Sequence, residues 1–222
     1  MQSTMTSEEA QAWEALLNWC GWALYHTPSA DDVANLVAER AVFAEPPFTE
    51  IAPAGSRELE QVLVRAGEAE DGAADLARAI HLDHTYLFRM TGQSKTSPYE
   101  SVYRTDEAIM FGDTLFDVRT RLADAGLRVD SDLNEPEDHA GLEFMLVGTL
   151  MGRGAVDEAR AFASEHLLVF APVYLENLRR RAQTDYYRAV AAICADALAR
   201  LAVVLKAEAV EQIDVTRYAV ER

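Results

Sequence analysis

The chain opens on the stretch TSEEAQAWEALLNWCGWAL, residues 6–24. Thr6 is followed three residues later by Glu9, which is the pattern of a capping box, where side chains satisfy the first backbone N–H groups of a helix. Apolar residues then recur at the three- and four-residue spacing of a single helix face. These features predict an amphipathic helix at the start of the chain. Its apolar face is expected to contain Trp13, Leu16, Leu17, Cys20 and Leu24.

The rest of the chain repeats this helical pattern, with little of the strict alternation that a half-buried strand requires. Ser29 and Asp32 mark a second helix start, whereas three prolines predict a loop over residues 45–55. Further helical segments are predicted around residues 59–63, 76–90, 106–126 and 142–150, and from residue 156 onward. The predicted fold is all-α, with about nine to eleven helices of typical length.

A polar connector covers residues 127–135, after Gly126, whose position suits a left-handed helix C-cap. We interpret this connector as a hinge between two closely packed lobes, residues 1–126 and residues 136–222. A hinge of this kind permits copies of a chain to exchange a lobe, so a monomer and a domain-swapped dimer are both expected states.

The composition narrows the classes of partner. The 222 residues are half hydrophobic and carry 37 acidic against 20 basic side chains, a net charge of −17. This charge repels nucleic acid and anionic lipid, and it favours either a basic partner or simple solubility. No export signal and no apolar run of about 18 residues is visible. Cys20 and Cys194 form no disulfide or zinc pattern. We therefore expect a cytoplasmic protein without a membrane span.

The stretch NEPEDH, residues 134–139, places several polar and charged side chains beside a predicted helix start. Pro136 suits the first turn of a helix, and acidic residues there complement the helix dipole, so one interpretation is an ordinary N-terminus. The other interpretation is that Glu135, Asp138 and His139 face a cleft between the lobes. Carboxylates in such a place bind guanidinium groups through paired hydrogen bonds.

This stretch resembles the E-P-x-D-H signature of the TorD/DmsD/NarJ family of redox-enzyme maturation chaperones. A second stretch is similar to another block of that family, with YLFR at residues 86–89 followed by SPYESVY at residues 97–103. A third resembles the F-x-x-x-H-L block, with Phe162 and His166, although Phe170 stands where many members carry tryptophan. The resemblance extends from about Trp13 to about Leu205.

The resemblance implies an all-helical chaperone without a cofactor and without a reaction of its own. Its partner would be the twin-arginine leader of a molybdopterin oxidoreductase of the dimethyl-sulfoxide or trimethylamine-oxide reductase type. Such a leader offers two adjacent guanidinium groups and an apolar segment of roughly 7 to 15 residues. The implied leader-binding residues are Glu135, Pro136, Asp138, His139, Tyr86, Leu87, Pro98, Tyr99 and Glu100.

Three alternatives stay open at this stage. The aromatic residues of the second block, including Tyr103, belong either to an apolar binding groove or to the core. A helical metal-dependent hydrolase would use Asp138 and His139 together with the cluster His81, Asp83 and His84. A generic scaffold would recognise a basic partner through charge alone.

Overall fold

The computed structural model describes residues 5–89, 96–105, 112–129 and 135–214. These residues contain helices and no β-strand, which confirms the all-α class and the expected number of helices. Three tighter or wider helical turns, η1 (Arg40–Ala44), η2 (Thr85–Arg89) and η3 (Ala163–Leu167), interrupt the α-helices. The α-helices are α1 (Ser7–Tyr25), α2 (Ala30–Ala38), α3 (Phe48–Ile51), α4 (Pro53–Glu68), α5 (Gly72–His84), α6 (Glu100–Arg104), α7 (Asp113–Asp124), α8 (Ala140–Gly152), α9 (Val156–Phe162), α10 (Leu168–Arg181) and α11 (Asp185–Leu205).

The chain divides into two compact units. Unit 1 comprises residues 1–25, 98–172 and 201–214, and unit 2 comprises residues 26–97, 173–200 and 215–222. Each unit draws on segments from both sides of the predicted hinge at residues 127–135. Residues 130–134 of that hinge lie outside the described residues. The hinge, and the lobes on either side of it, therefore stay predictions.

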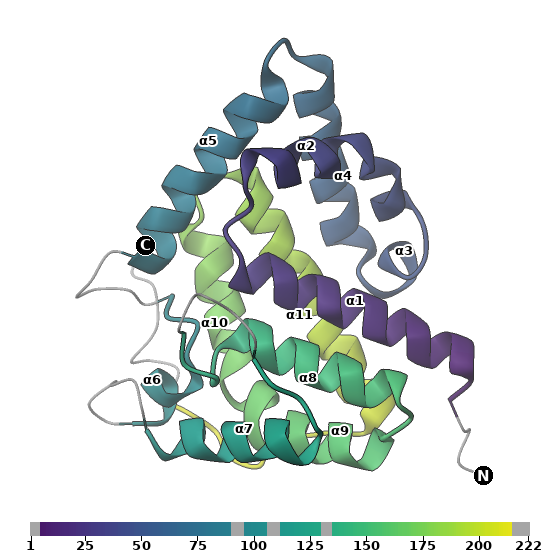
Figure 1. Cartoon of the computed structure of the whole chain (residues 1–222), viewed down its shortest axis with the longest axis vertical. Helices are drawn as coiled ribbons and strands as arrows, with labels where there is room; N and C mark the ends of the chain where they lie inside the picture. Colours follow the sequence, from purple (N-terminus) through teal and green to yellow (C-terminus); the bar gives the residue numbers. More distant parts are fainter. Residues whose placement is uncertain (1–4, 90–95, 106–111, 130–134, 215–222) are drawn as a thin grey trace. The chain divides into compact units, whose positions relative to one another are not determined.

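The first helix of unit 1, α1, packs along α8 (Figure 1). The predicted capping box is present, because the Thr6 backbone N–H donates to the Glu9 carboxylate at 2.8 Å and the Glu9 N–H to the Thr6 hydroxyl at 3.2 Å. The five apolar residues predicted for its inner face are all buried. The two helix backbones approach closely at a pair of glycines: a Cβ at Gly21 would lie 2.4 Å from the Gly141 carbonyl oxygen. Local sequence and packing therefore agree on this helix.

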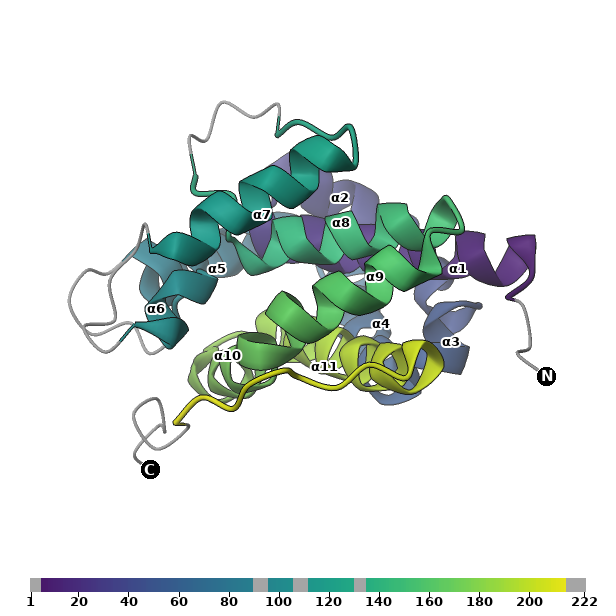
Figure 2. The same cartoon turned by 90° about the horizontal axis from the view of Figure 1, so that it is seen from below.

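The other helices of unit 1 that bear on the site are α6 and α7, which contact each other. Helix α7 is seen beside α8 in Figure 2. The predicted helix over residues 106–126 is observed as α7, while residues 106–111 lie outside the described part of the chain. Gly126 follows α7 with a φ of +67°, the left-handed conformation expected of a C-cap glycine. The short helix α6 was not predicted.

In unit 2, the predicted start at Ser29 is confirmed as the N-cap of α2, with a reciprocal capping box to Asp32. The predicted loop over residues 45–55 is wrong in part, because α3 lies within it and α4 begins at Pro53. Proline lacks the N–H group that a first helical turn leaves unbonded, so it is compatible with a helix start as well as with a break. The predicted helix around residues 59–63 lies within α4.

Two remaining observations concern membranes and thiols. No helix in the described ranges combines the length and the apolar character that crossing a bilayer requires. Cys20 and Cys194 are both free and buried.

Candidate functional site

The EPEDH stretch lies before α8 rather than inside it. The N-cap of α8 is His139, whose Nδ1 accepts a hydrogen bond from the Gly141 N–H at 3.0 Å. A helix does start near Pro136, as predicted, but the proline and the acidic residues lie before its first turn rather than in it. Because His139 supplies the cap itself, the acidic residues before it are available to bond other parts of unit 1.

The stretch is joined by main-chain hydrogen bonds to the second block of the family resemblance. Tyr99 and His139 form an isolated antiparallel β-bridge. On either side of it, the Glu100 N–H donates to the Asp138 carbonyl at 2.9 Å, and the Ala140 N–H donates to the Pro98 carbonyl at 2.8 Å. Residues that are far apart in the sequence thus form one local structure. It brings together seven of the nine predicted site residues: Pro98, Tyr99, Glu100, Glu135, Pro136, Asp138 and His139.

Asp138 is fully buried, with 0% of its surface exposed. Its Oδ2 accepts a hydrogen bond from the backbone N–H of Ser101 at 2.9 Å. Ser101 lies in the first turn of α6, so the carboxylate stabilises the start of that helix as a capping residue does. An external guanidinium group has no access to a carboxylate in this position. The contact between Asp138 and a leader arginine stays a prediction, and the carboxylate has a structural role in this structure.

We expect Asp138→Ala to lower the free energy of unfolding by about 1–2 kcal/mol, because the Ser101 N–H would lose its partner. Asp138→Asn keeps an oxygen that can accept the same hydrogen bond. Its free energy of unfolding should therefore fall clearly less than that of Asp138→Ala. Urea denaturation of both variants and of the parent chain measures these differences. Equal stability of Asp138→Ala and the parent chain would contradict the capping role.

Among the predicted site residues joined here, Tyr99 and Glu135 are the accessible ones, and both are half-buried. The Tyr99 hydroxyl donates a hydrogen bond to the Glu135 carboxylate. The His139 ring lies beneath, only 5% exposed, and makes edge-to-face contacts with Tyr99 and Tyr25 at centroid distances of 5.4 and 5.0 Å. Tyr99 therefore presents its polar end beside Glu135 at the surface while its ring contacts the buried histidine.

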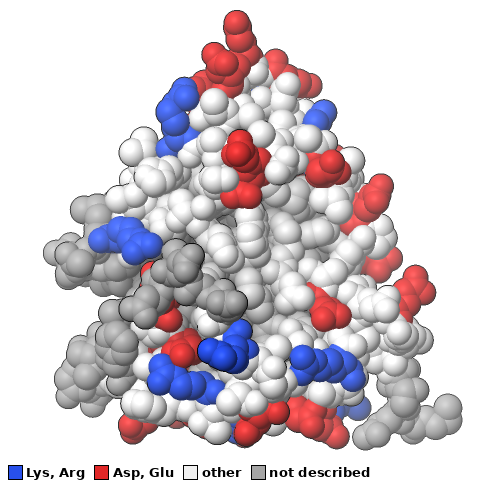
Figure 3. Space-filling model, viewed as in Figure 1, with Lys and Arg blue, Asp and Glu red and all other residues white. Residues whose placement is uncertain are grey.

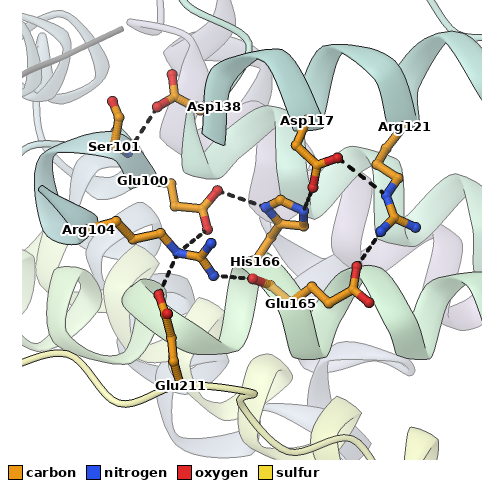
Figure 4. Close-up of polar contacts among 9 residues, drawn as sticks. All are labelled: Glu100, Ser101, Arg104, Asp117, Arg121, Asp138, Glu165, His166 and Glu211. Atoms are coloured by element: carbon orange, nitrogen blue, oxygen red, sulfur yellow. Dashed lines mark hydrogen bonds and ion pairs between the residues drawn. The ribbon is translucent and has the colours of Figure 1, made fainter. Parts of the chain in front are cut away.

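An ionic cluster surrounds the buried side chains of Glu100 and His166 (Figure 4). Glu100 is fully buried and pairs with Arg104 Nε at 3.0 Å through one oxygen and with His166 Nδ1 at 2.9 Å through the other. The second ring nitrogen of His166 is 2.9 Å from Asp117 Oδ2 on α7. Arg104 also contacts the Glu211 carboxylate at 3.0 Å. Through these hydrogen bonds and ion pairs, the cluster connects α6 with α7, with η3 and with the segment that follows α11.

A further carboxyl group, Glu143 in the first turn of α8, is fully buried near this cluster. Burial raises its pKa well above the ordinary value, and the negative charges of Glu100 and Asp138 raise the pKa further. This direction of the pKa shift favours the neutral, protonated form of the Glu143 side chain. Sequence reasoning missed Glu143 because its position in an apolar helical pattern carries no sign of acidic neighbours from other segments.

Tyr86 and Leu87, the two other predicted site residues, belong to unit 2. Both lie in η2, where Leu87 is buried and Tyr86 is 40% exposed. Tyr103 is buried in unit 1 and its ring packs against Phe170 at a centroid distance of 5.5 Å. Of the two interpretations for the aromatic residues, the structure supports core packing for Tyr103.

The residues of the hydrolase alternative have other partners. Asp83 accepts hydrogen bonds from the backbone N–H groups of Gln183 and Thr184, just before α11, at 3.0 and 2.8 Å. His84 is bonded to Thr27 at 2.8 Å, and burial, with smaller effects of Arg89 and His81, lowers its pKa to about 4. Within the described ranges, no three His, Cys, Asp or Glu side chains are placed to hold a metal ion. Nothing in this geometry supports the hydrolase.

The amino-acid sequence of the chain is similar to those of known proteins. A sequence model of the nitrate reductase delta subunit family matches residues 49–176. The chain is 33% identical to the probable Tat proofreading chaperone DmsD of Haemophilus influenzae, over 52% of this chain and 57% of that protein. It is 29% identical to the chaperone protein TorD of Vibrio cholerae over 61% of this chain and 64% of TorD. The Tat proofreading chaperone DmsD of Salmonella typhi is 29% identical over 42% of this chain and 46% of that protein. The chain thus spans about half to two thirds of the length of these relatives.

Proposed function

Since the chain belongs to the nitrate reductase delta subunit family, we propose that it is a redox-enzyme maturation chaperone that binds the twin-arginine signal peptide of a molybdopterin-dependent oxidoreductase. The observation that carries this proposal is the extent of the family match, residues 49–176, which includes the whole structure built from residues 98–104, 135–143 and His166. The names of the similar proteins, Tat proofreading chaperone and chaperone protein, support the same class.

In this proposal the chain catalyses no reaction. It holds the leader of a client enzyme in the cytoplasm, together with part of the mature client, until the molybdenum cofactor is inserted. The proposed client is of the dimethyl-sulfoxide or trimethylamine-oxide reductase type. Tyr99 and Glu135 are the members of the predicted site with exposed surface in unit 1, so we assign the contact with the leader to them. Pro98, Glu100, Pro136, Asp138 and His139 are buried and hold that surface in place.

The charge of the chain is compatible with a second candidate, a scaffold that attracts basic partners through charge alone. Asp and Glu side chains are scattered over the face drawn in Figure 3, with Lys and Arg side chains among them. A net charge of −17 steers any basic peptide toward the chain, and this attraction weakens as salt rises. The two candidates differ in whether arginine is preferred over lysine, because only guanidinium forms paired hydrogen bonds with a carboxylate.

Calorimetric titration with synthetic leader peptides tests the proposal. The peptides come from molybdopterin enzymes encoded near the gene for this chain, in versions with Arg-Arg or Lys-Lys, at two salt concentrations. We expect saturable binding at one site and an affinity roughly tenfold higher for Arg-Arg, about 1.4 kcal/mol. Equal affinities that fall steeply with salt would instead establish the charge-only scaffold.

A further inference from the structure

The second acidic residue of the EPEDH stretch, Glu137, already binds a guanidinium group of the chain itself. Arg119 on α7 donates from Nε to Glu137 Oε1 at 2.9 Å and from its terminal nitrogen to Oε2 at 2.8 Å. Both carboxylate oxygens thus face both arms of one guanidinium fork, which is the bidentate geometry of arginine recognition. The hydrogen bond from Arg119 is the largest cause of the lowered pKa of Glu137.

This pair is accessible to solvent. The side chain of Arg119 is 54% exposed and that of Glu137 is 22% exposed. Exposed ion pairs of this kind contribute only about 0–1 kcal/mol to stability, so breaking the pair needs little free energy. A second arginine that approaches from solvent can therefore exchange with Arg119 without unfolding any element.

The other two carboxylates of the stretch are placed differently. Asp138 is buried and bonded to the Ser101 backbone. Glu135 is half-buried and receives the Tyr99 hydroxyl, so part of its hydrogen-bonding capacity is already used within the chain. Glu137 is the member of the stretch whose two oxygens are both held by a replaceable guanidinium group.

We propose that Glu137 is a guanidinium-binding position, and that Arg119 occupies it in the free chain until an arginine of a basic client peptide takes its place. The inference rests on the proposed function for the identity of the client, and it adds a residue that the sequence alone did not single out. Arg119 then acts as an internal competitor that lowers the affinity for every arginine-bearing peptide. A lysine has no fork and competes less well.

Four charge-neutralising variants test this exchange by titration with the Arg-Arg leader. Arg119→Gln removes the competitor, and we expect the affinity to rise about two- to fivefold, the range that an exposed pair of up to about 1 kcal/mol allows. Glu137→Gln removes the position itself and should lower the affinity. Arg179→Gln and Glu58→Gln are the matched controls, because these residues form an exposed pair in unit 2 at 3.2 Å and change the net charge equally. The controls should bind the leader as the parent chain does.

A second measurement does not depend on the leader. In the ¹⁵N-labelled chain, the Nε–H resonance of Arg119 is identified by its loss in Arg119→Gln, and the chain is titrated with acetyl-Arg-Arg-amide and acetyl-Lys-Lys-amide. We expect the arginine dipeptide to shift the Arg119 resonance and to leave the Arg179 resonance in place. The lysine dipeptide should affect neither.

The outcomes separate the two proposals. If the leader binds the parent chain, Arg119→Gln and Glu137→Gln equally well, the guanidinium-binding position is wrong while the chaperone function stands. If the arginine dipeptide displaces Arg119 but no leader binds, the chaperone function is wrong while the position stands. An Arg119 resonance that neither dipeptide moves overturns the position outright.

Discussion

Replacing Arg104 by methionine is expected to lower the free energy of unfolding by about 3–5 kcal/mol at neutral pH. Arg104 is the guanidinium partner of Glu100, which is fully buried beside Asp138 and Glu143. Methionine fills much of the same volume but removes the positive charge. The Glu100 carboxylate would then keep its contact with His166 Nδ1 at 2.9 Å but lose its guanidinium partner. Thermal or urea denaturation, followed by circular dichroism, measures the loss.

A double variant separates the loss of charge from the loss of packing. In the double variant Arg104→Met with Glu100→Gln, no buried carboxylate is left without its guanidinium partner, because the other partner of Arg104, Glu211, is 51% exposed. We therefore expect the double variant to lose at least about 1 kcal/mol less stability than the two single variants together. Arg121→Met is the matched control, because Arg121 and its partner Glu165 are 38% and 40% exposed. The free energy of unfolding of this control should fall by less than about 1 kcal/mol. Similar losses for Arg104→Met and Arg121→Met would show that the cluster behaves as a surface pair.

Much of the helical framework was predictable because its signals are local. In α1, the cap at Thr6 and Glu9 and the buried face from Trp13 to Leu24 lie within a few turns of each other. The same holds for the capping box at Ser29 and for the left-handed Gly126. Proline was ambiguous for a physical reason, since Pro53 stops a preceding helix and starts the next with the same missing N–H group.

The site was predictable only in outline. The motif and the Tyr99 block were identified from sequence, and the structure joins them through the bridge between Tyr99 and His139. The roles of the carboxylates were not predictable, because each depends on a partner distant in sequence. Asp138 bonds a backbone N–H 37 positions away, and Glu137 bonds an arginine 18 positions away. Composition and periodicity carry no information on such pairings.

Glu143 provides the second large expected effect, a change in how stability depends on pH. Its pKa is raised well above 4.5 in the folded chain by burial and then by the charges of Glu100 and Asp138. The unfolded chain therefore releases this proton at lower pH than the folded chain does. The contribution of Glu143 to stability is fully present below pH 4.5 and is lost as pH rises toward the folded pKa.

For one such group, the free energy of unfolding falls by at most about 1.4 kcal/mol for each pH unit between pH 5 and pH 7. Glu143→Gln has nearly the same shape and no proton to release, so its stability relative to the parent chain should rise over that range. His84 acts in the opposite direction, because its pKa of about 4 makes the folded chain more stable as pH rises toward the ordinary value of 6.5. His84 is present in both proteins, so the difference between their unfolding free energies cancels its effect and isolates Glu143.

Urea denaturation of both proteins at pH 5, 6 and 7 gives this difference directly. A difference that grows with pH means that Glu143 is buried as a neutral acid. The segment from Pro98 to Arg104 would then be held to α8 without an ionised Glu143. A difference that stays constant with pH would mean that Glu143 is already ionised in the folded chain, so that the cluster holds one more negative charge than we infer.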